Sequence, residues 1–346
     1  MVYKYAKKIG VIFLVVFGLL TAGQAFSGNK QIMDRYLNYI EVSDAIEYKN
    51  LKIFPIVLKQ ELSTKSYVTL DQAYKQNCLS IRELKSATVN TIEIQNNGSE
   101  PVFIMTGEII KGAKQDRMVK NDILLEPNGK VVEVPVYCVE HGRWRHVSSE
   151  FKSADKVAPS SVRKGAKISC NQSEVWNCVA SVQKDCGVAS ETGTLMDSYE
   201  DKNTKQELDL YEQKFERIPD LSDRTIGVIV TTGNKIVCFD LFANNNLFKK
   251  LWNKLIKSYA LDGLSGTKST VRKKEVESFV DQIEGLGKNA VGIGTIGLGQ
   301  LYELDSDFGK GSALVDDASV VHMDFFIGEK VVYKTPKSPC GNRMAL

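Results

Sequence analysis

Short apolar segments separated by turn residues fill positions 51–150, and this pattern limits the fold more than any other feature of the chain. We expect strands at 51–60, 79–84, 88–95, 102–106, 123–126 and 131–139. Asn97-Gly98 and Pro127-Asn128-Gly129 have the composition of tight turns, so we expect each of them to join two neighbouring strands in a hairpin. Such a region predicts an antiparallel, sandwich-like sheet system.

Two local signals refine this β-rich region. Pro55 lacks a backbone N–H group, so the strand at 51–60 is expected at a sheet edge or a bend. Thr69 is followed three residues later by Gln72, which is the signature of a helix N-cap and predicts a short helix at 70–76.

The second half of the chain mixes helices with strands. Helical spacing of apolar residues predicts helices at 174–183, 206–215, 247–261 and 275–283. Strands are expected at 226–231 and 235–239 around Gly233-Asn234, and again at 301–304 and 319–326. Residues 153–173 are polar, so we expect a connection or flexible loop there. The fold class is therefore α+β, with an antiparallel β-rich N-terminal half and a mixed α/β half that contains one long amphipathic helix.

The N-terminus has the three-part layout of a secretory signal. Lysines precede an apolar run from Ile9 to Leu20, and Gly23 and Ala25 occupy the −3 and −1 positions of a signal peptidase site. The apolar run is shorter than the roughly 20 residues of a membrane-spanning helix. We therefore expect cleavage after Ala25 and a secreted or periplasmic, soluble mature protein. Retention of the segment as a membrane anchor is the alternative.

The expected organisation follows from these patterns. Residues 1–25 form the signal, 26–50 a polar approach segment, 51–333 a domain that can divide into lobes at 51–152 and 153–333, and 334–346 a loose tail. The net charge is +3, and the signal removes lysines, so the mature chain is near neutral and nothing indicates a nucleic-acid partner. No later segment predicts stable membrane insertion.

All seven cysteines follow the predicted signal, and disulfides persist outside the cytoplasm. Cys170, Cys178 and Cys186 are evenly spaced, and one disulfide within this group or none both stay open, because spacing cannot choose a pair. Cys78 and Cys238 lie among apolar residues and are interpreted as buried small hydrophobic side chains.

Three clusters contain residues of the types that bind ligands or take part in catalysis. Gly292 to Gly297 matches the GxGxxG dinucleotide fingerprint, but no helix is expected after it, so we interpret it as a glycine-rich strand or bend. In the charged segment 107–117, Glu108, Gln115 and Arg117 can hold a polar ligand. The alternative is an exposed, charged loop.

The third cluster is Cys138 to His146. In an extended chain, Cys138, Glu140 and His146 would share one face, and these residue types bind zinc, although their spacing matches no known zinc motif. Cys138 as a nucleophile with a histidine base is a second alternative. In a third, structural interpretation, Trp144 packs in the core and Arg143 pairs with Glu140.

Together, the segments Gly107 to Arg117 and Val134 to Trp144 resemble the hallmark of the ARG and rhodanese-phosphatase-superfamily-associated protein domain family. Further similarity lies in Val175-Trp176, Asp240 to Phe242, Trp252 to Asp262 and Val321 to Phe326, so the resemblance covers about residues 50–330. The activity of the family is not established. Its name records a genomic association with ADP-ribosylglycohydrolases and rhodanese-like phosphatases, which implies nucleotide or ADP-ribose chemistry.

With the resemblance, the two motifs imply a polar site. We expect a small polar or phosphorylated ligand, nucleotide- or ADP-ribose-like, to be bound by Gln115, Arg117, Arg143 and Trp144. The alternative is a hydrolase or transferase with Glu108 or Glu140 as general base, assisted by His322 or His146. A structural or interaction protein without a chemical site is the third hypothesis. The sequence identifies no cofactor.

Overall fold

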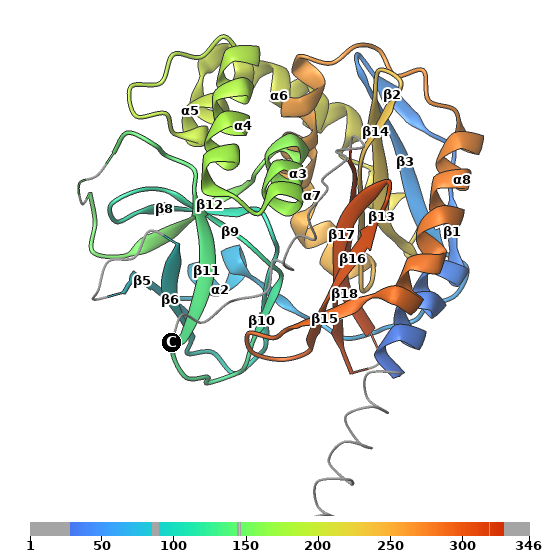
Figure 1. Cartoon of the computed structure of the whole chain (residues 1–346), viewed down its shortest axis with the longest axis horizontal. Helices are drawn as coiled ribbons and strands as arrows, with labels where there is room; N and C mark the ends of the chain where they lie inside the picture. Colours follow the sequence, from blue (N-terminus) through green and yellow to red (C-terminus); the bar gives the residue numbers. More distant parts are fainter. Residues whose placement is uncertain (1–27, 85–89, 144, 146, 318, 329–346) are drawn as a thin grey trace, which may run out of the picture.

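The computed structural model of the protein describes residues 28–84, 90–143, 145, 147–317 and 319–328 (Figure 1). The expected signal and tail, together with Trp144 and His146, lie outside the described residues. The α+β prediction is confirmed, because antiparallel sheets are combined with helices throughout the described chain.

A large sheet combines strands from both ends of the described chain. Its strands are β1 (Ile40–Val42), β2 (Ile46–Tyr48), β3 (Leu51–Leu58), β13 (Thr225–Thr232), β14 (Lys235–Phe242), β15 (Val291–Gly294), β16 (Gln300–Ser306), β17 (Gly309–Asp316) and β18 (Ser319–Ile327). Their order is β1-β3-β13-β14-β18-β17-β16-β15, with β2 paired to β3. All of these pairings are antiparallel.

The second lobe contains two smaller sheets and the short helix α2 (Leu70–Lys75). One sheet has the order β12-β8-β9-β11-β6-β5, and the other has the order β10-β7-β4. The strands are β4 (Val68–Thr69), β5 (Leu79–Glu83), β6 (Thr91–Asn96), β7 (Val102–Ile104), β8 (Glu108–Gly112), β9 (Arg117–Val119), β10 (Ile123–Leu125), β11 (Val132–Cys138) and β12 (Phe151–Val157). Apolar residues of both sheets share one core cluster, which gives the lobe its sandwich-like character.

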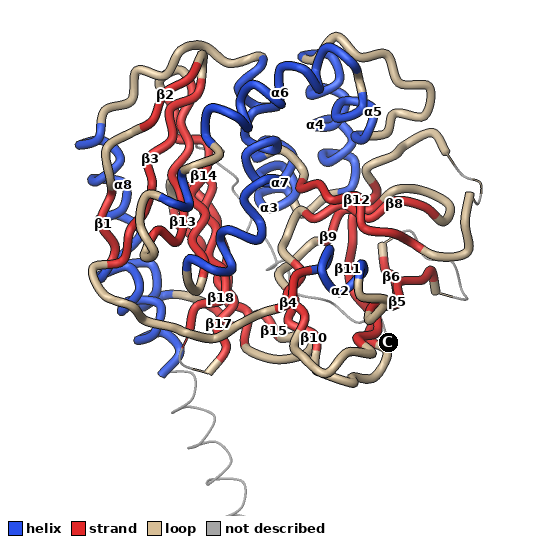
Figure 2. Tube along the Cα trace, turned by 180° about the vertical axis from the view of Figure 1, so that it is seen from behind, coloured by secondary structure: helices blue, strands red, loops and turns tan. Residues whose placement is uncertain are grey.

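Helices cover both faces of the large sheet (Figures 1 and 2). The helices that follow the second lobe in the chain are α3 (Ser160–Ser169), α4 (Gln172–Asp185), α5 (Leu195–Glu200), α6 (Lys202–Phe215), α7 (Asn245–Leu264) and α8 (Lys273–Glu284), with short 3-10 turns at η1 (Ile218–Asp220) and η2 (Gly285–Asn289). Of these, α4 and α5 lie over the second lobe, and α4 packs against β11 (Figure 1). A helix at residues 28–39 and α8 share a core with one face of the sheet. The core on the other face includes α7 and extends into the second lobe.

The sequence predicts α7 well, because local signals and packing agree. The side chain of Asn244 caps the helix by accepting a 3.0 Å hydrogen bond from the backbone N–H of Leu247. Leu251, Leu255 and Tyr259 continue the apolar face and are fully buried. The N-cap of α2 at Thr69, with Gln72 completing a capping box, is confirmed as well.

The hairpin expected at Gly233-Asn234 is confirmed, since Thr232 pairs with Lys235 across the turn. The other two expected hairpins are wrong. β6 pairs with β5 and β11, whereas β7 pairs with β4 and β10, so each of these turns carries the chain from one sheet to the other. The two turns instead contact each other, because the N–H of Asn128 donates to the carbonyl of Gly98 at 2.7 Å.

Residues 153–173 form β12 and α3, so the expected connection there is wrong. The segment is polar because Ser160 and Arg163 bind buried partners, and polarity in this case does not mean exposure. Residues 28–50 also differ from the polar approach segment that the sequence suggests. They form a helix and two strands, and Met33, Tyr36 and Leu37 pack in the core.

β3, which the sequence assigns to the expected lobe at 51–152, pairs with β13 of the large sheet instead. Pro55 therefore lies inside a sheet rather than at its edge. The missing N–H group is tolerated because Pro55 lies opposite the gap between β1, which pairs with residues 56–58, and β2, which pairs with residues 51–53.

The cysteine group contains no internal disulfide. Cys170 is disulfide-bonded, whereas Cys178 and Cys186 are free thiols. Cys238 is fully buried, as expected, whereas the expected burial of Cys78 is wrong, because its side chain is partly exposed.

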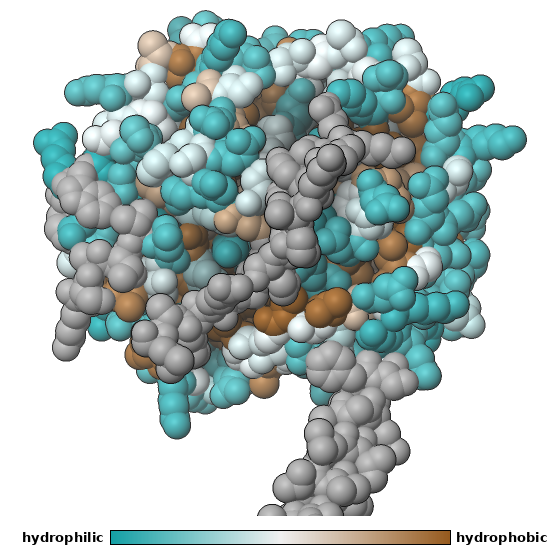
Figure 3. Space-filling view, viewed as in Figure 1, coloured by the Kyte–Doolittle hydropathy of each residue, from teal (hydrophilic) through white to brown (hydrophobic). Residues whose placement is uncertain are grey.

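The described residues contain no helix long and apolar enough to cross a membrane. On the face drawn in Figure 3, hydrophilic residues predominate and hydrophobic residues form small separate areas.

The glycine-rich segment 292–297 forms β15 and a bend, as the sequence suggests, and it connects the two lobes. Gly297 bridges to Leu124 of β10, and the N–H of Leu298 donates to the carbonyl of Leu124 at 2.7 Å. Gly297 has a φ of +80°, and a Cβ atom there would lie 2.1 Å from the Leu124 carbonyl oxygen. Only glycine allows this close approach.

We predict that Gly297→Ala lowers the free energy of unfolding by at least about 2 kcal/mol, because it adds backbone strain and a clash between the lobes. Urea denaturation followed by circular dichroism measures the change. Gly285→Ala is the matched control, since Gly285 has an open surrounding and a negative φ. Equal stability of the two variants would contradict the proposed close contact.

Candidate functional site

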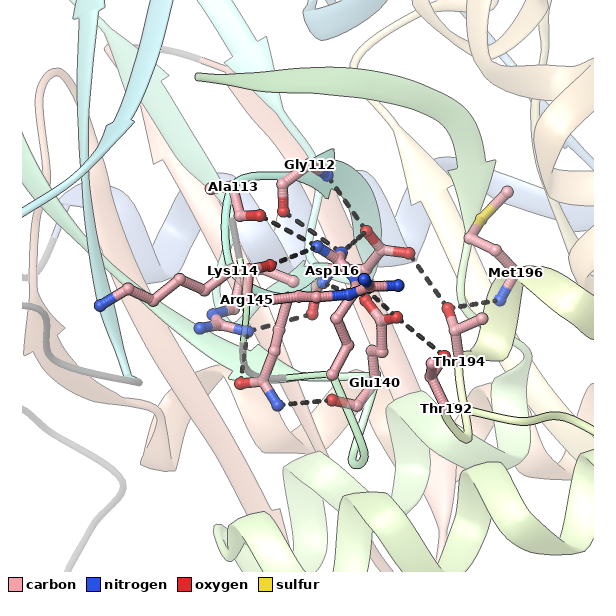
Figure 4. Close-up of polar contacts among 12 residues, drawn as sticks. Gly112, Ala113, Lys114, Asp116, Glu140, Arg145, Thr192, Thr194 and Met196 are labelled. Carbon is pink, nitrogen blue, oxygen red and sulfur yellow. Dashed lines mark hydrogen bonds and ion pairs between the residues drawn. The ribbon is translucent and has the colours of Figure 1, made fainter. Parts of the chain in front are cut away.

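The two sequence motifs meet in a group that we call the motif cluster: Gly112, Gln115, Asp116, Glu140, Arg143, Thr192 and Thr194 (Figure 4). Arg143 holds the two acids together. Its Nη2 lies 3.1 Å from Oδ1 of Asp116 and 2.6 Å from Oε2 of Glu140, and its Nε donates to Oε1 of Glu140 at 2.7 Å. These contacts join the β8–β9 loop to the segment after β11.

The remaining acceptor positions of the motif cluster are also filled. Thr194 donates to Oδ2 of Asp116 at 3.0 Å, and Thr192 donates to Oε1 of Glu140 at 2.8 Å. Burial and the neighbouring Glu140 raise the pKa of Asp116. Burial also acts to raise the pKa of Glu140, but hydrogen bonds from Arg143 and the Asp116 backbone outweigh it and lower that pKa. An ionised, fully paired Glu140 is a weak general base.

Arg117 extends the motif cluster inward through its contact with Gln115. Nε2 of Gln115 donates to the Glu140 carbonyl at 2.8 Å, and Nη1 of Arg117 donates to Oε1 of Gln115 at 3.3 Å. Arg117 is only 2% exposed. Cys138 lies nearby, and burial raises the pKa of its thiol, which disfavours a nucleophilic thiolate. No group of three or more metal-ligating side chains occurs among the described residues, and His146 of the zinc hypothesis is not one of them.

Glu108 lies apart from the motif cluster. It is fully buried and paired with Lys254 of α7, and its Oε2 accepts from the N–H of Met105 at 2.7 Å. Lys254 also contacts Asp71 at 2.5 Å. Burial raises the pKa of Glu108 to about 7, with Asp71 adding to the rise and Lys254 opposing it. Glu108 therefore ties β8 to α7 and does not meet Glu140.

His322 lies in a third place, beside what we call the polar row: Glu303, Ser312, Asp324 and Asp240. These residues are paired in register across β16, β17, β18 and β14, so their side chains share one face of the large sheet. His322 precedes Asp324 by two residues and therefore points to the same face.

Cations from α3 and from β17 of the sheet itself neutralise the polar row. Arg163 of α3 donates to both oxygens of Asp240, with Nη1 at 3.0 Å from Oδ2, and the hydroxyl of Tyr259 donates to the same carboxylate at 2.6 Å. Lys167 lies 3.3 Å from Oδ2 of Asp324. Lys310 lies 3.1 Å from Glu303. Burial acts to raise the pKa of Asp240, but Arg163 and His322 outweigh it and hold that pKa well below its usual range.

His322 connects the large sheet to the second lobe. Its Nδ1 lies 2.8 Å from Oδ2 of Asp122, its Nε2 lies 3.3 Å from Oδ1 of Asp240, and its ring stacks on Phe242. Burial acts to lower the pKa of His322, but the two carboxylates raise it to about 9. An imidazole with this pKa is mostly protonated near neutral pH, which disfavours a role as general base.

Near the polar row, several buried polar atoms have no hydrogen-bond partner among the described residues: the Tyr137 hydroxyl, Nε of Arg163 and Oδ2 of Asp324. Lys120 follows β9, and its Nζ lies 5.5 Å from the Tyr137 ring centre. Burial lowers the pKa of Lys120, with Glu303 opposing and Lys167 adding to the effect, so Lys120 and Lys167 are electrostatic neighbours.

Sequence reasoning identified His322 but missed its partners. Asp240 and Asp324 entered only through the family resemblance, and Arg163 fell in the presumed loop. One local signal was present, because His322 and Asp324 are polar residues two positions apart in an otherwise apolar strand.

Fold and site thus define a two-lobed α+β protein whose lobes meet across a buried ionic network. The profile of the ARG and Rhodanese-Phosphatase-superfamily-associated Protein domain matches residues 39–326, and the chain belongs to this family. Searches of curated proteins and of solved structures find no match.

We predict that His322 stabilises the fold in a pH-dependent way. The pKa of His322 is about 9 in the folded protein and about 6.5 in the unfolded chain, so the stabilisation is complete below pH 6.5 and is lost as pH rises through 9. The free energies of unfolding of wild type and His322→Gln should differ by about 3 kcal/mol more at pH 6 than at pH 10. Urea denaturation across this range tests it, with exposed His141→Gln as control. A pH-independent difference would refute the charged state.

We predict that Arg143→Ala lowers the free energy of unfolding by about 3 kcal/mol, because two buried carboxylates lose their common cation. Thermal denaturation at neutral pH measures the loss. Arg145→Ala is the control, since the side chain of Arg145 is exposed. A stable Arg143→Ala variant would show that the motif cluster is not structural.

Proposed function

We propose that the protein binds a small phosphorylated ligand of the sugar-phosphate or ADP-ribose type at the polar row, between the large sheet and the second lobe. Lys120 carries this proposal. It is half-buried, and no carboxylate among the described residues lies within ion-pair distance of it. A half-buried ammonium group without a counter-ion favours an anionic ligand.

The surrounding groups suit the rest of such a ligand. Lys167 approaches from α3 and adds a second cation beside Lys120. Oδ2 of Asp324 can accept hydrogen bonds from sugar hydroxyls, and the Tyr137 hydroxyl can donate to a phosphate oxygen. Cations for the phosphate and carboxylates for hydroxyl groups are thus both present.

In this proposal, the two motifs hold the backbone around the site in place, and they do not contact the ligand themselves. The carboxylates of the motif cluster have their hydrogen bonds filled by Arg143, Thr192 and Thr194. The motif that contains Arg117 leads directly through β9 to Lys120 and Asp122. A fixed β8–β9 loop therefore helps to position the ligand contacts.

We also propose that the N-terminal segment is a cleaved export signal and that the mature protein is extracytoplasmic. Cleavage after Ala25 would keep residues 28–39 in the mature protein, including the buried side chains of Met33 and Tyr36. N-terminal sequencing of the protein from its native host should begin at Phe26. An intact N-terminus in the membrane fraction would contradict this proposal.

The ligand proposal predicts a rise in melting temperature with ribose 5-phosphate or ADP-ribose. Isothermal titration calorimetry should show at least tenfold weaker binding in Lys120→Met, because the unpaired cation is lost. Lys130→Met is the matched control, since Lys130 is an exposed lysine on a nearby turn.

Absence of binding to either compound, or equal binding by Lys120→Met and Lys130→Met, would overturn the proposed site. Hydrolysis of ADP-ribose that is lost in folded Glu108→Gln or Glu140→Gln would instead favour the enzyme hypothesis.

A further inference from the structure

A separate pocket of about 270 Å³ lies where β8, β12, α5, α6 and α7 meet. None of its lining residues belongs to the polar row or the motif cluster. Its charged lining comprises Lys111, Lys156, Lys205, Lys257, Glu200 and Asp209, and its apolar lining comprises Ala154, Met196, Tyr199 and Leu208. Lysines therefore outnumber acids around a partly apolar floor.

Lys156 is a partly buried, unmatched charge of this pocket. Lys111 is paired with Glu200 at 3.5 Å and Lys257 with Glu212 at 2.9 Å, whereas no carboxylate in the described part of the chain lies within ion-pair distance of Lys156. Its Nζ donates to the carbonyl of Asp155 at 3.0 Å. Burial lowers the pKa of Lys156, and the neighbouring Lys257 and Lys111 lower it further, although Asp155 opposes them.

The backbone directs Lys156 into the pocket through an irregularity in β12. The pairing of β12 with β8 shifts between Ser153 and Val157, and Asp155 has a left-handed φ of 52°. Bulges of this kind change the direction of the following side chain. Nζ of Lys156 lies 5.9 Å from the centre of the Tyr199 ring, whose hydroxyl donates to the Val157 carbonyl at 2.5 Å.

We infer that this pocket binds a small anion attached to a flat apolar group, such as an aromatic phosphate. Lys156 contacts the anionic group, with Lys205 at the rim, while Tyr199, Met196 and Leu208 pack against the apolar body. A bound anion supplies the counter-charge that Lys156 lacks. The site shares no residue with the proposed sugar-phosphate site and stands independently of it.

Phenyl phosphate and inorganic phosphate are the probes, measured by isothermal titration calorimetry on the mature chain. Phenyl phosphate should bind more tightly than inorganic phosphate, because only the former covers the apolar floor. Lys156→Met should weaken phenyl phosphate binding at least tenfold, and Lys156→Arg should retain it. Lys152→Met is the matched control, because Lys152 is an exposed lysine of the same strand outside the pocket.

The inference is overturned if wild type does not bind phenyl phosphate, or if Lys156→Met and Lys152→Met bind it equally. If Lys156→Met does not fold, Lys205→Met replaces it, because Lys205 is an exposed rim residue. A severalfold loss in that variant supports the site, and unchanged affinity refutes it. Lys120→Met should leave phenyl phosphate binding at this pocket unchanged, so the two proposals fail separately.

Discussion

The carboxylate of Asp240 is the point on which the arrangement of the two lobes depends. It is fully buried, its charge is balanced by Arg163 of α3 and by His322 of the neighbouring strand, and it accepts a hydrogen bond from the hydroxyl of Tyr259 on α7. His322 in turn contacts Asp122 of the second lobe. Breaking such a buried pair from one side costs about 3–5 kcal/mol, because the remaining charge has no solvent. Two helices and a lobe interface are therefore positioned by one side chain.

The motif cluster and the polar row differ in one physical respect. In the motif cluster, threonine hydroxyls and Arg143 fill the acceptor positions of both acids, so it stabilises loops and has little capacity for a ligand. The polar row is also paired, but Oδ2 of Asp324 lacks a hydrogen bond, and Lys120 lies nearby without a carboxylate partner. A candidate binding site therefore differs from a structural ion pair in having polar groups without a hydrogen-bond or ion-pair partner, and not in the number of its charges.

The sequence predicts what is local and misses what is distant. α7 and the turn at Gly233-Asn234 follow from spacing and turn chemistry within a few residues. The turn at Asn97-Gly98 is also local, but the partner of each strand is chosen by sheet packing, which the turn does not encode. Arg163 was invisible because its partner Asp240 is 77 positions away, and a polar segment without visible partners resembles a loop.

The large sheet has a consequence for the order in which the chain can fold. The hydroxyl of Thr231 on β13 donates to the carbonyl of Lys52 on β3, and these residues are 179 positions apart. Contacts of this length form slowly because a long loop must close first. During synthesis, β3 can pair only with β1 and β2 until β13 has left the ribosome, and the pairing of β14 with β18 forms later still. The large sheet therefore assembles only after nearly the whole chain has been made, whereas the second lobe can condense earlier from contiguous sequence.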